Sequence, residues 1–102
     1  MVTWTIAARK SLKKIHEYIA TDSHYYANKL VASIIAKGES LDKFPQMGRI
    51  VPEFSDDSVR EVYVSPYRIL YQVSSNDVKI LNVLHGKRDL ENAFKEKDQQ
   101  TQ

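Results

Sequence analysis

The stretch YRILYQVSSNDVKILNVLHGKRDL, residues 67–90, decides the fold of this chain. Two runs rich in branched and aromatic residues, 67–74 and 77–85, flank the polar pair Ser75-Asn76. Such runs around a short polar segment are typical of two antiparallel β-strands joined by a tight turn. The stretch therefore predicts a β-hairpin at the centre of a sheet.

The far end of this hairpin concentrates positive charge. If the turn has two residues, Ser74 pairs with Asp77, and Arg68 lies opposite Val83 and diagonal to His85. One predicted face holds Arg68, Leu70, Gln72, Lys79, Leu81, Val83 and His85. The other predicted face holds Ile69, Tyr71, Val73, Val78, Ile80 and Leu84. Arg68 and His85 are thus expected on one face of the sheet.

The rest of the chain predicts one more hairpin, this time of helices. Alternating apolar residues at 2–6 indicate a short strand, and the spacing changes to a helical one over 8–21. Asp22 and Ser23 are expected to cap a second helix that ends near Phe44, before Pro45. Gly38 within this helix is expected either to allow close approach of the first helix or to be a weak spot near the helix end.

A long connection, 45–58, precedes a further predicted strand at 59–65. Ser65-Pro66 is the expected turn into the next strand. The resulting order is strand, helix, helix, strand, strand, strand.

Composition limits the class of protein. The 102 residues with 42% hydrophobic content are expected to form one domain, 1–95, followed by a flexible tail at 96–102. Cysteine is absent, which excludes disulfides and thiolate chemistry. No apolar run approaches the ~20 residues of a membrane span, so a cytoplasmic protein without membrane contact is expected. Fifteen basic and thirteen acidic residues do not indicate a nucleic-acid binder by total charge.

Both faces of the predicted hairpin are apolar, and a helix pair covers only one of them. Leu70, Leu81 and Val83 would then be bare beside Arg68 and His85, which predicts contact with another protein. The alternative is that the connection 45–58, or the segment after Arg88, covers them.

Several motifs in fixed order resemble the RelE/ParE superfamily of type II toxin–antitoxin toxins, and its ParE-like branch in particular. They are IHEYIA in the first helix, LDKFPQMGRIVPEF, VREVYVSPYRILYQV and VLHGKRDL. The resemblance covers nearly the whole chain and implies an α+β fold. In that fold an N-terminal strand and an α-helical hairpin pack on a mostly antiparallel four-stranded sheet.

The resemblance also implies a function. ParE-like toxins are expected to inhibit DNA gyrase by binding, without catalysis, and to be neutralised by a cognate antitoxin in a hetero-oligomer. RelE-like toxins instead cut messenger RNA on the ribosome. An inactive relative that only binds antitoxin is a third possibility.

The nuclease alternative assigns chemical roles to four residues. Arg68 and Arg88 match the arginines of the nuclease pattern and would clamp a phosphate. His85 would be the acid or base near neutral pH. Phe94 stands where that pattern has a tyrosine, and a phenylalanine can stack on a base but cannot transfer a proton. Val62, Tyr63 and Val64 stand where the pattern has lysines, which also favours the ParE-like reading.

Other basic residues have simpler explanations. Arg68 is also expected to pair with Glu61 or Asp89 as a structural group. The helix residues Arg9, Lys10, Lys13 and Lys14 are expected to form a solvated face that could attract an acidic antitoxin or DNA. Candidates for target or antitoxin contact are Arg49, Arg60, Arg68, Leu70, Leu81, Val83, Lys87 and Arg88. His16, His24 and His85 lack ligand spacing, so no metal or other cofactor is expected.

Overall fold

The computed structural model describes residues 1–75 and 77–86. The predicted site residues Lys87, Arg88 and Phe94, the alternative ion-pair partner Asp89 and the predicted tail at 96–102 lie outside the described residues.

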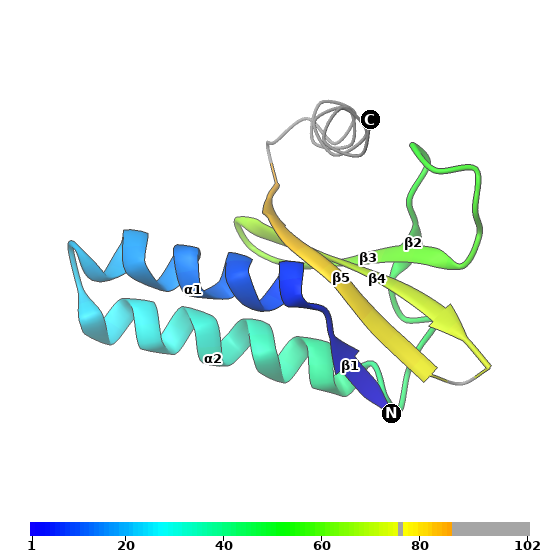
Figure 1. Cartoon of the computed structure of the whole chain (residues 1–102), viewed down its shortest axis with the longest axis horizontal. Coiled ribbons are helices and arrows are strands. Elements are labelled where there is room, and N and C mark those ends of the chain that lie inside the picture. The colour runs from blue at the N-terminus through cyan, green and yellow to red at the C-terminus, as the bar shows by residue number, and fades with distance from the viewer. Residues whose placement is uncertain (76, 87–102) are drawn as a thin grey trace.

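Two helices and a five-stranded sheet make up the described part of the chain (Figure 1). The elements are β1 Val2–Trp4, α1 Ile6–Ala20, α2 His24–Ser40, β2 Arg49–Ile50, β3 Val59–Val64, β4 Tyr67–Ser74 and β5 Asp77–His85. The strand order is β1-β5-β4-β3-β2, with β1 parallel to β5 and every other pair antiparallel. The predicted α+β fold is confirmed. Within the described residues, neither helix has the length and apolar character to cross a membrane.

The sheet has five strands rather than the predicted four. The connection 45–58 contains β2, in which Arg49 pairs with Glu61 and Ile50 pairs with Arg60. A two-residue strand leaves no alternation in the sequence, because period-two patterns need at least four residues to be recognised.

Capping residues set where the helices begin. The side chain of Thr5 accepts a hydrogen bond from the backbone N–H of Ala8, so α1 starts at Ile6. Ser23 accepts from the N–H of Tyr26, as the sequence predicts for α2. The end of α2 was predicted too late, near Phe44. Its backbone tightens at Leu41, whose N–H bonds to the carbonyl of Gly38.

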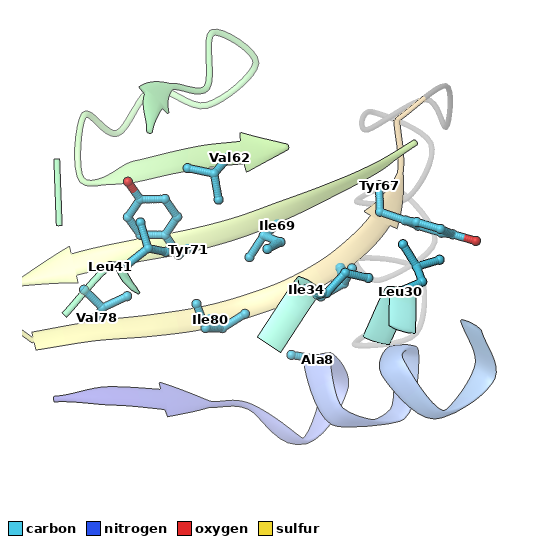
Figure 2. Close-up of a cluster of buried hydrophobic side chains, with 11 residues drawn as sticks. Ala8, Leu30, Ile34, Leu41, Val62, Tyr67, Ile69, Tyr71, Val78 and Ile80 are labelled. Atoms are coloured by element: carbon cyan, nitrogen blue, oxygen red, sulfur yellow. The ribbon is translucent and has the colours of Figure 1, made fainter. Parts of the chain in front are cut away.

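The main core fills the space between the helices and one face of the sheet (Figure 2). Helix residues Ala8, Leu30 and Ile34 meet strand residues such as Ile69 and Ile80, each of them buried. The full buried cluster is Ala8, Leu30, Ile34, Leu41, Val62, Tyr67, Ile69, Tyr71, Val78, Ile80 and Val83. This is the layer that the two helical stripes and the alternating strands predict.

A β-bulge changes the predicted register of β4 and β5. Ser74 pairs with Asp77, as expected for a two-residue turn, and the register holds to Tyr71 and Ile80. The next pair joins Leu70 to Asn82, so Leu81 is one extra residue in β5. Beyond it every side chain of β5 changes face relative to the prediction.

The bulge separates two residues that were expected together. Arg68 pairs with Leu84 rather than lying opposite Val83, and Tyr67 pairs with His85. Next to the bulge, the Ser11 hydroxyl of α1 donates to the side-chain oxygen of Asn82 at 2.6 Å. The prediction that Arg68 and His85 share a face is therefore wrong.

The second face of the sheet is also covered, at least in part, by the chain itself. Val51, Val59, Leu70 and Leu84 form a buried cluster there, with Phe54 and Leu81 packed against it. Leu70 is only 1% exposed, and Val83 lies on the helix side and is 3% exposed. Both side chains are buried in this chain, so the expectation that they are bare is wrong. The connection 45–58 covers Leu70. Coverage by this connection was the alternative to contact with a protein partner.

Gly38 in α2 accommodates Trp4 rather than the first helix. A Cβ added at Gly38 would lie 2.5 Å from Cζ2 of the Trp4 ring. The indole N–H of Trp4 also donates to the Glu39 carboxylate at 2.9 Å, next to the glycine. Close contact of β1 with the end of α2 therefore requires glycine, and the predicted contact with α1 is wrong.

We predict that Gly38→Ala lowers the free energy of unfolding by about 1–3 kcal/mol, the typical cost of overpacking. A glycine-to-alanine change in an open helix has the opposite sign, about 1 kcal/mol stabilising. Urea denaturation measures the difference. In a Trp4→Leu background the same change should be neutral or stabilising, whereas stabilisation in the natural background would contradict the assignment.

Candidate functional site

A cluster of charged side chains lies on the sheet face opposite the helices. Glu61 and Tyr63 are two apart on β3, so they share this face with Arg68, which pairs with Tyr63, and Arg49, which pairs with Glu61. Three adjacent strands, β2, β3 and β4, therefore each contribute to it. We refer to Arg49, Glu61, Tyr63 and Arg68 as the arginine–glutamate cluster.

Glu61 is the centre of this cluster and is 1% exposed. Nη2 of Arg68 donates to its Oε2. Nε of Arg49 donates to its Oε1 at 2.7 Å, and the Tyr63 hydroxyl donates to the same oxygen at 3.0 Å. Both carboxylate oxygens are thus satisfied by charged or polar donors, as a buried carboxylate requires.

These contacts decide the protonation state of Glu61. Burial by itself would raise the pKa of its carboxyl group, but the hydrogen bonds from Arg68, Arg49 and Tyr63 outweigh burial and hold that pKa below its ordinary value. The hydrogen bond between Arg49 and Glu61 also raises the pKa of the Arg49 guanidinium. Glu61 is therefore an anion that neutralises its arginine partners.

Arg68 is enclosed as well as paired. It is 6% exposed, and its guanidinium carbon lies 5.8 Å from the centroid of the Tyr63 ring. Glu53 adds a second, more distant carboxylate at 3.8 Å from Nη2. The Nε of Arg68 is buried and has no hydrogen-bond partner among the described residues. The structural alternative predicted for Arg68, pairing with Glu61, is confirmed.

The FP-x-x-GR segment, residues 44–49 within the LDKFPQMGRIVPEF motif, is held beside this cluster by a second set of polar contacts. The Tyr71 hydroxyl donates to the carbonyl of Pro45 at 2.8 Å and accepts from the N–H of Gly48 at 2.9 Å. Arg60, one of the predicted contact residues, donates to the carbonyl of Gly48 at 2.7 Å. A Cβ at Gly48 would lie 2.4 Å from the carbonyl oxygen of Glu61. The motif thus brings Arg49 to Glu61.

His85 lies apart from the cluster, at the exposed end of β5. Its ring meets the buried Tyr67 ring edge-on, with centroids 5.6 Å apart and planes at 76°. Tyr67 belongs to the core on the helix side, whereas Arg68 faces the opposite side. The structure therefore does not bring together the two described residues of the nuclease pattern, His85 and Arg68.

Sequence reasoning named the arginines but did not predict that Glu61 binds both Arg49 and Arg68. Glu61 was considered only as a partner of Arg68, while Tyr63 and Glu53 were not assigned any contact role. The signal available in the sequence was the two-residue spacing of Val59, Glu61 and Tyr63, which places their side chains on one face of β3. Among the described residues, no group of three His, Cys, Asp or Glu side chains is arranged to hold a metal ion.

A family model for the ParE toxin of the type II toxin–antitoxin system parDE matches residues 2–90. This chain belongs to the ParE toxin family. The motifs predicted a type II toxin of the RelE/ParE superfamily, and the family match confirms this prediction. The predicted fold is confirmed by its similarity to solved structures.

Curated relatives of this ParE-family chain carry related names. It is 32% identical over 88 residues to Toxin RelE2 of Caulobacter vibrioides, covering 85% of this chain and 96% of that protein. It is 35% identical over 87 residues to the toxin-like protein Y4kP of Sinorhizobium fredii, covering 83% and 86%.

Solved structures show that the ParE-family fold is shared. The chromosomal ParDE system of P. aeruginosa matches with a TM-score of 0.68 and 22% identity, over 82% of this chain and 92% of that chain. The RelBE2 toxin–antitoxin complex of Mycobacterium tuberculosis matches with a TM-score of 0.63 and 21% identity, over 83% and 95%.

We predict that Glu61→Gln lowers the free energy of unfolding by about 3–5 kcal/mol, because it removes the buried counter-ion of Arg68 and leaves only the more distant Glu53 carboxylate. Chemical denaturation measures the loss. Glu53→Gln is the matched control: its carboxylate is more exposed and more distant, so it should cost less than about 1 kcal/mol.

If Glu61→Gln does not fold, a Glu61→Leu/Arg68→Met double variant provides the test. Replacing both partners removes the buried charges together, so the double variant should be more stable than Arg68→Met alone. A double variant less stable than that single variant would contradict the ion-pair assignment.

The lowered pKa of Glu61 predicts an acid-dependent contribution to stability. The contribution is complete above the unfolded pKa of about 4.3 and is lost as the pH falls through the lower folded pKa. We therefore expect the stability difference between the natural chain and Glu61→Gln to be constant near neutral pH and to shrink below about pH 4. Denaturation curves across this range test it, and a difference that grows on acidification would contradict it.

Proposed function

We propose that this chain is a growth-arresting toxin that binds and inhibits DNA gyrase, and that a cognate antitoxin neutralises it. The observation that carries the proposal is the engagement of Arg68 by Glu61. A residue that clamps a phosphate must offer free donors to it, whereas Arg68 is enclosed and its charge is balanced. Membership of the ParE toxin family supports the same choice.

Cleavage of RNA needs an acid or base and a cation at one phosphate. His85 and Arg68 lie on opposite sides of the sheet, so they do not meet at one phosphate. Strand β3 presents buried Val62 and half-exposed Tyr63 where the nuclease pattern has lysines. Inhibition by binding requires no such assembly, and it is therefore the function that this geometry supports better.

An antitoxin partner is supported by the surface of the chain and by its relatives. The solved relatives from P. aeruginosa and M. tuberculosis are toxin–antitoxin systems. Large apolar side chains are exposed on both helices and on the connection after α2. They include Ile6, Tyr18, Tyr25, Tyr26, Ile35, Phe44, Met47 and Ile50. A partner that covers part of this surface would remove it from water.

A gyrase supercoiling assay with the purified chain tests the proposal. We expect supercoiling to be inhibited and cleaved plasmid to accumulate, while ribosome-bound messenger RNA stays intact. Codon-dependent RNA cleavage with gyrase unaffected would establish the nuclease alternative instead.

His85→Gln separates the two mechanisms within one protein. A general acid or base contributes about 10²–10⁴-fold to a reaction rate, so a nuclease would lose most of its activity. Under the proposal, growth arrest and gyrase inhibition by this variant should stay within about threefold of the natural chain. Its melting temperature serves as the control, since the ring of His85 contacts Tyr67.

A further inference from the structure

One helix face is strongly basic and takes no part in the arginine–glutamate cluster. Arg9, Lys10, Lys13 and Lys14 are all exposed on α1, on the side away from its buried residue Ala8 and its packed residue Leu12. We refer to these four residues as the basic face of α1. In the part of the chain that the structure describes, no carboxylate lies within ion-pair distance of any of them.

The basic face accounts for the positive charge of the whole chain. Residues 1–16 contain these four cations and no Asp or Glu. The other eleven basic residues are outnumbered by the thirteen acidic ones, although the chain as a whole has a net charge of +2. The small net charge of the whole chain therefore does not reveal the local positive charge at the basic face of α1.

This arrangement opposes the stability of α1. Arg9, in the first turn of α1, is repelled by the positive end of the helix dipole, and that turn contains no acidic residue. Arg9 with Lys13, and Lys10 with Lys14, are like charges four residues apart, which also destabilise a helix, and the opposite charge of Glu17, four residues after Lys13, offsets only part of this. An anion bound at this face would relieve both effects.

We propose that the basic face of α1 binds the phosphate backbone of duplex DNA, without reading its sequence. The helical rise of about 1.5 Å per residue places Arg9 and Lys13 about 6 Å apart along the axis. Phosphates recur at about 3.4 Å along each strand of duplex, so cations one turn apart on α1 can contact phosphates one or two positions apart. Backbone contacts of this kind need cations and no base-specific groups.

Duplex DNA fits this face better than an acidic peptide does. Between Arg9 and Lys14 the remaining side chains are Ser11 and the inward-packed Leu12, so no apolar side chain is exposed among the four cations, although Ile6 is exposed one turn earlier on α1. A peptide that folds on binding depends on such anchors, whereas phosphate binding is driven by counter-ion release. The inference goes beyond gyrase inhibition and does not require it.

Fluorescence anisotropy with the purified full chain and a short labelled duplex of arbitrary sequence tests this binding. Four phosphate contacts predict a slope of about −3.6 for log K against log salt, or about a hundredfold weaker binding between 50 and 200 mM salt. The variant Arg9→Gln/Lys10→Gln/Lys13→Gln/Lys14→Gln should lose most of this slope. Glutamine keeps the helix propensity, and circular dichroism checks that α1 is intact.

A charge-matched variant, Lys29→Gln/Lys37→Gln/Lys43→Gln/Lys79→Gln, removes four cations elsewhere and should largely retain the slope. Equal losses in both variants would overturn the proposal, because net charge alone would then explain the binding. Unchanged DNA binding by the α1 variant would also overturn it, and loss of antitoxin affinity in that case would assign the face to an acidic protein. Gyrase is absent from this assay, so failure of gyrase inhibition leaves its result unaffected.

Discussion

The buried carboxylate of Glu61 is the interaction on which the second face of the sheet depends. It receives donors from β2, β3 and β4 and so fixes three strands to one another on the side away from the helices. A buried charge is tolerated only when it is paired and fully hydrogen-bonded, and Glu61 meets that requirement through two arginines and a tyrosine. The connection 45–58 then covers the adjacent apolar residues.

The family motifs acquire a physical explanation from this arrangement. In FP-x-x-GR the carbonyl of Pro45 and the N–H of Gly48 bind Tyr71, and Arg49 binds Glu61. VRE supplies Glu61, while YRI-x-Y supplies Arg68 and Tyr71. The motifs that identify the chain are thus largely contacts of its fold, so a shared motif does not by itself assign a shared chemistry. Function must be argued from groups that remain accessible, such as the basic face of α1.

Part of the candidate site was predictable from sequence. The rest was not, because it depends on short local features of the sheet that leave no clear pattern in the sequence. The sequence identified Arg49, Arg60 and Arg68 and offered Glu61 as one partner for Arg68. It did not predict that Arg49 and Arg60 would also be engaged within the fold, because their contacts depend on β2, a strand of only two residues, and on Gly48 just before it. The sequence also placed Arg68 beside His85. This prediction failed because one extra residue in β5 leaves the pattern of apolar residues almost unchanged, so the bulge cannot be recognised from sequence.

The sequence by itself determined the α+β class, the helical hairpin, its serine cap and the two-residue register at the tip of β4 and β5. These features follow from hydrophobic periodicity and from capping and turn chemistry, which act over a few neighbouring residues. Only the tertiary structure decided which side of the sheet each charged group faces. The bulge at Leu81, the pairing of β2 and the contact of Trp4 with Gly38 join residues far apart in sequence, and side-chain packing selects them.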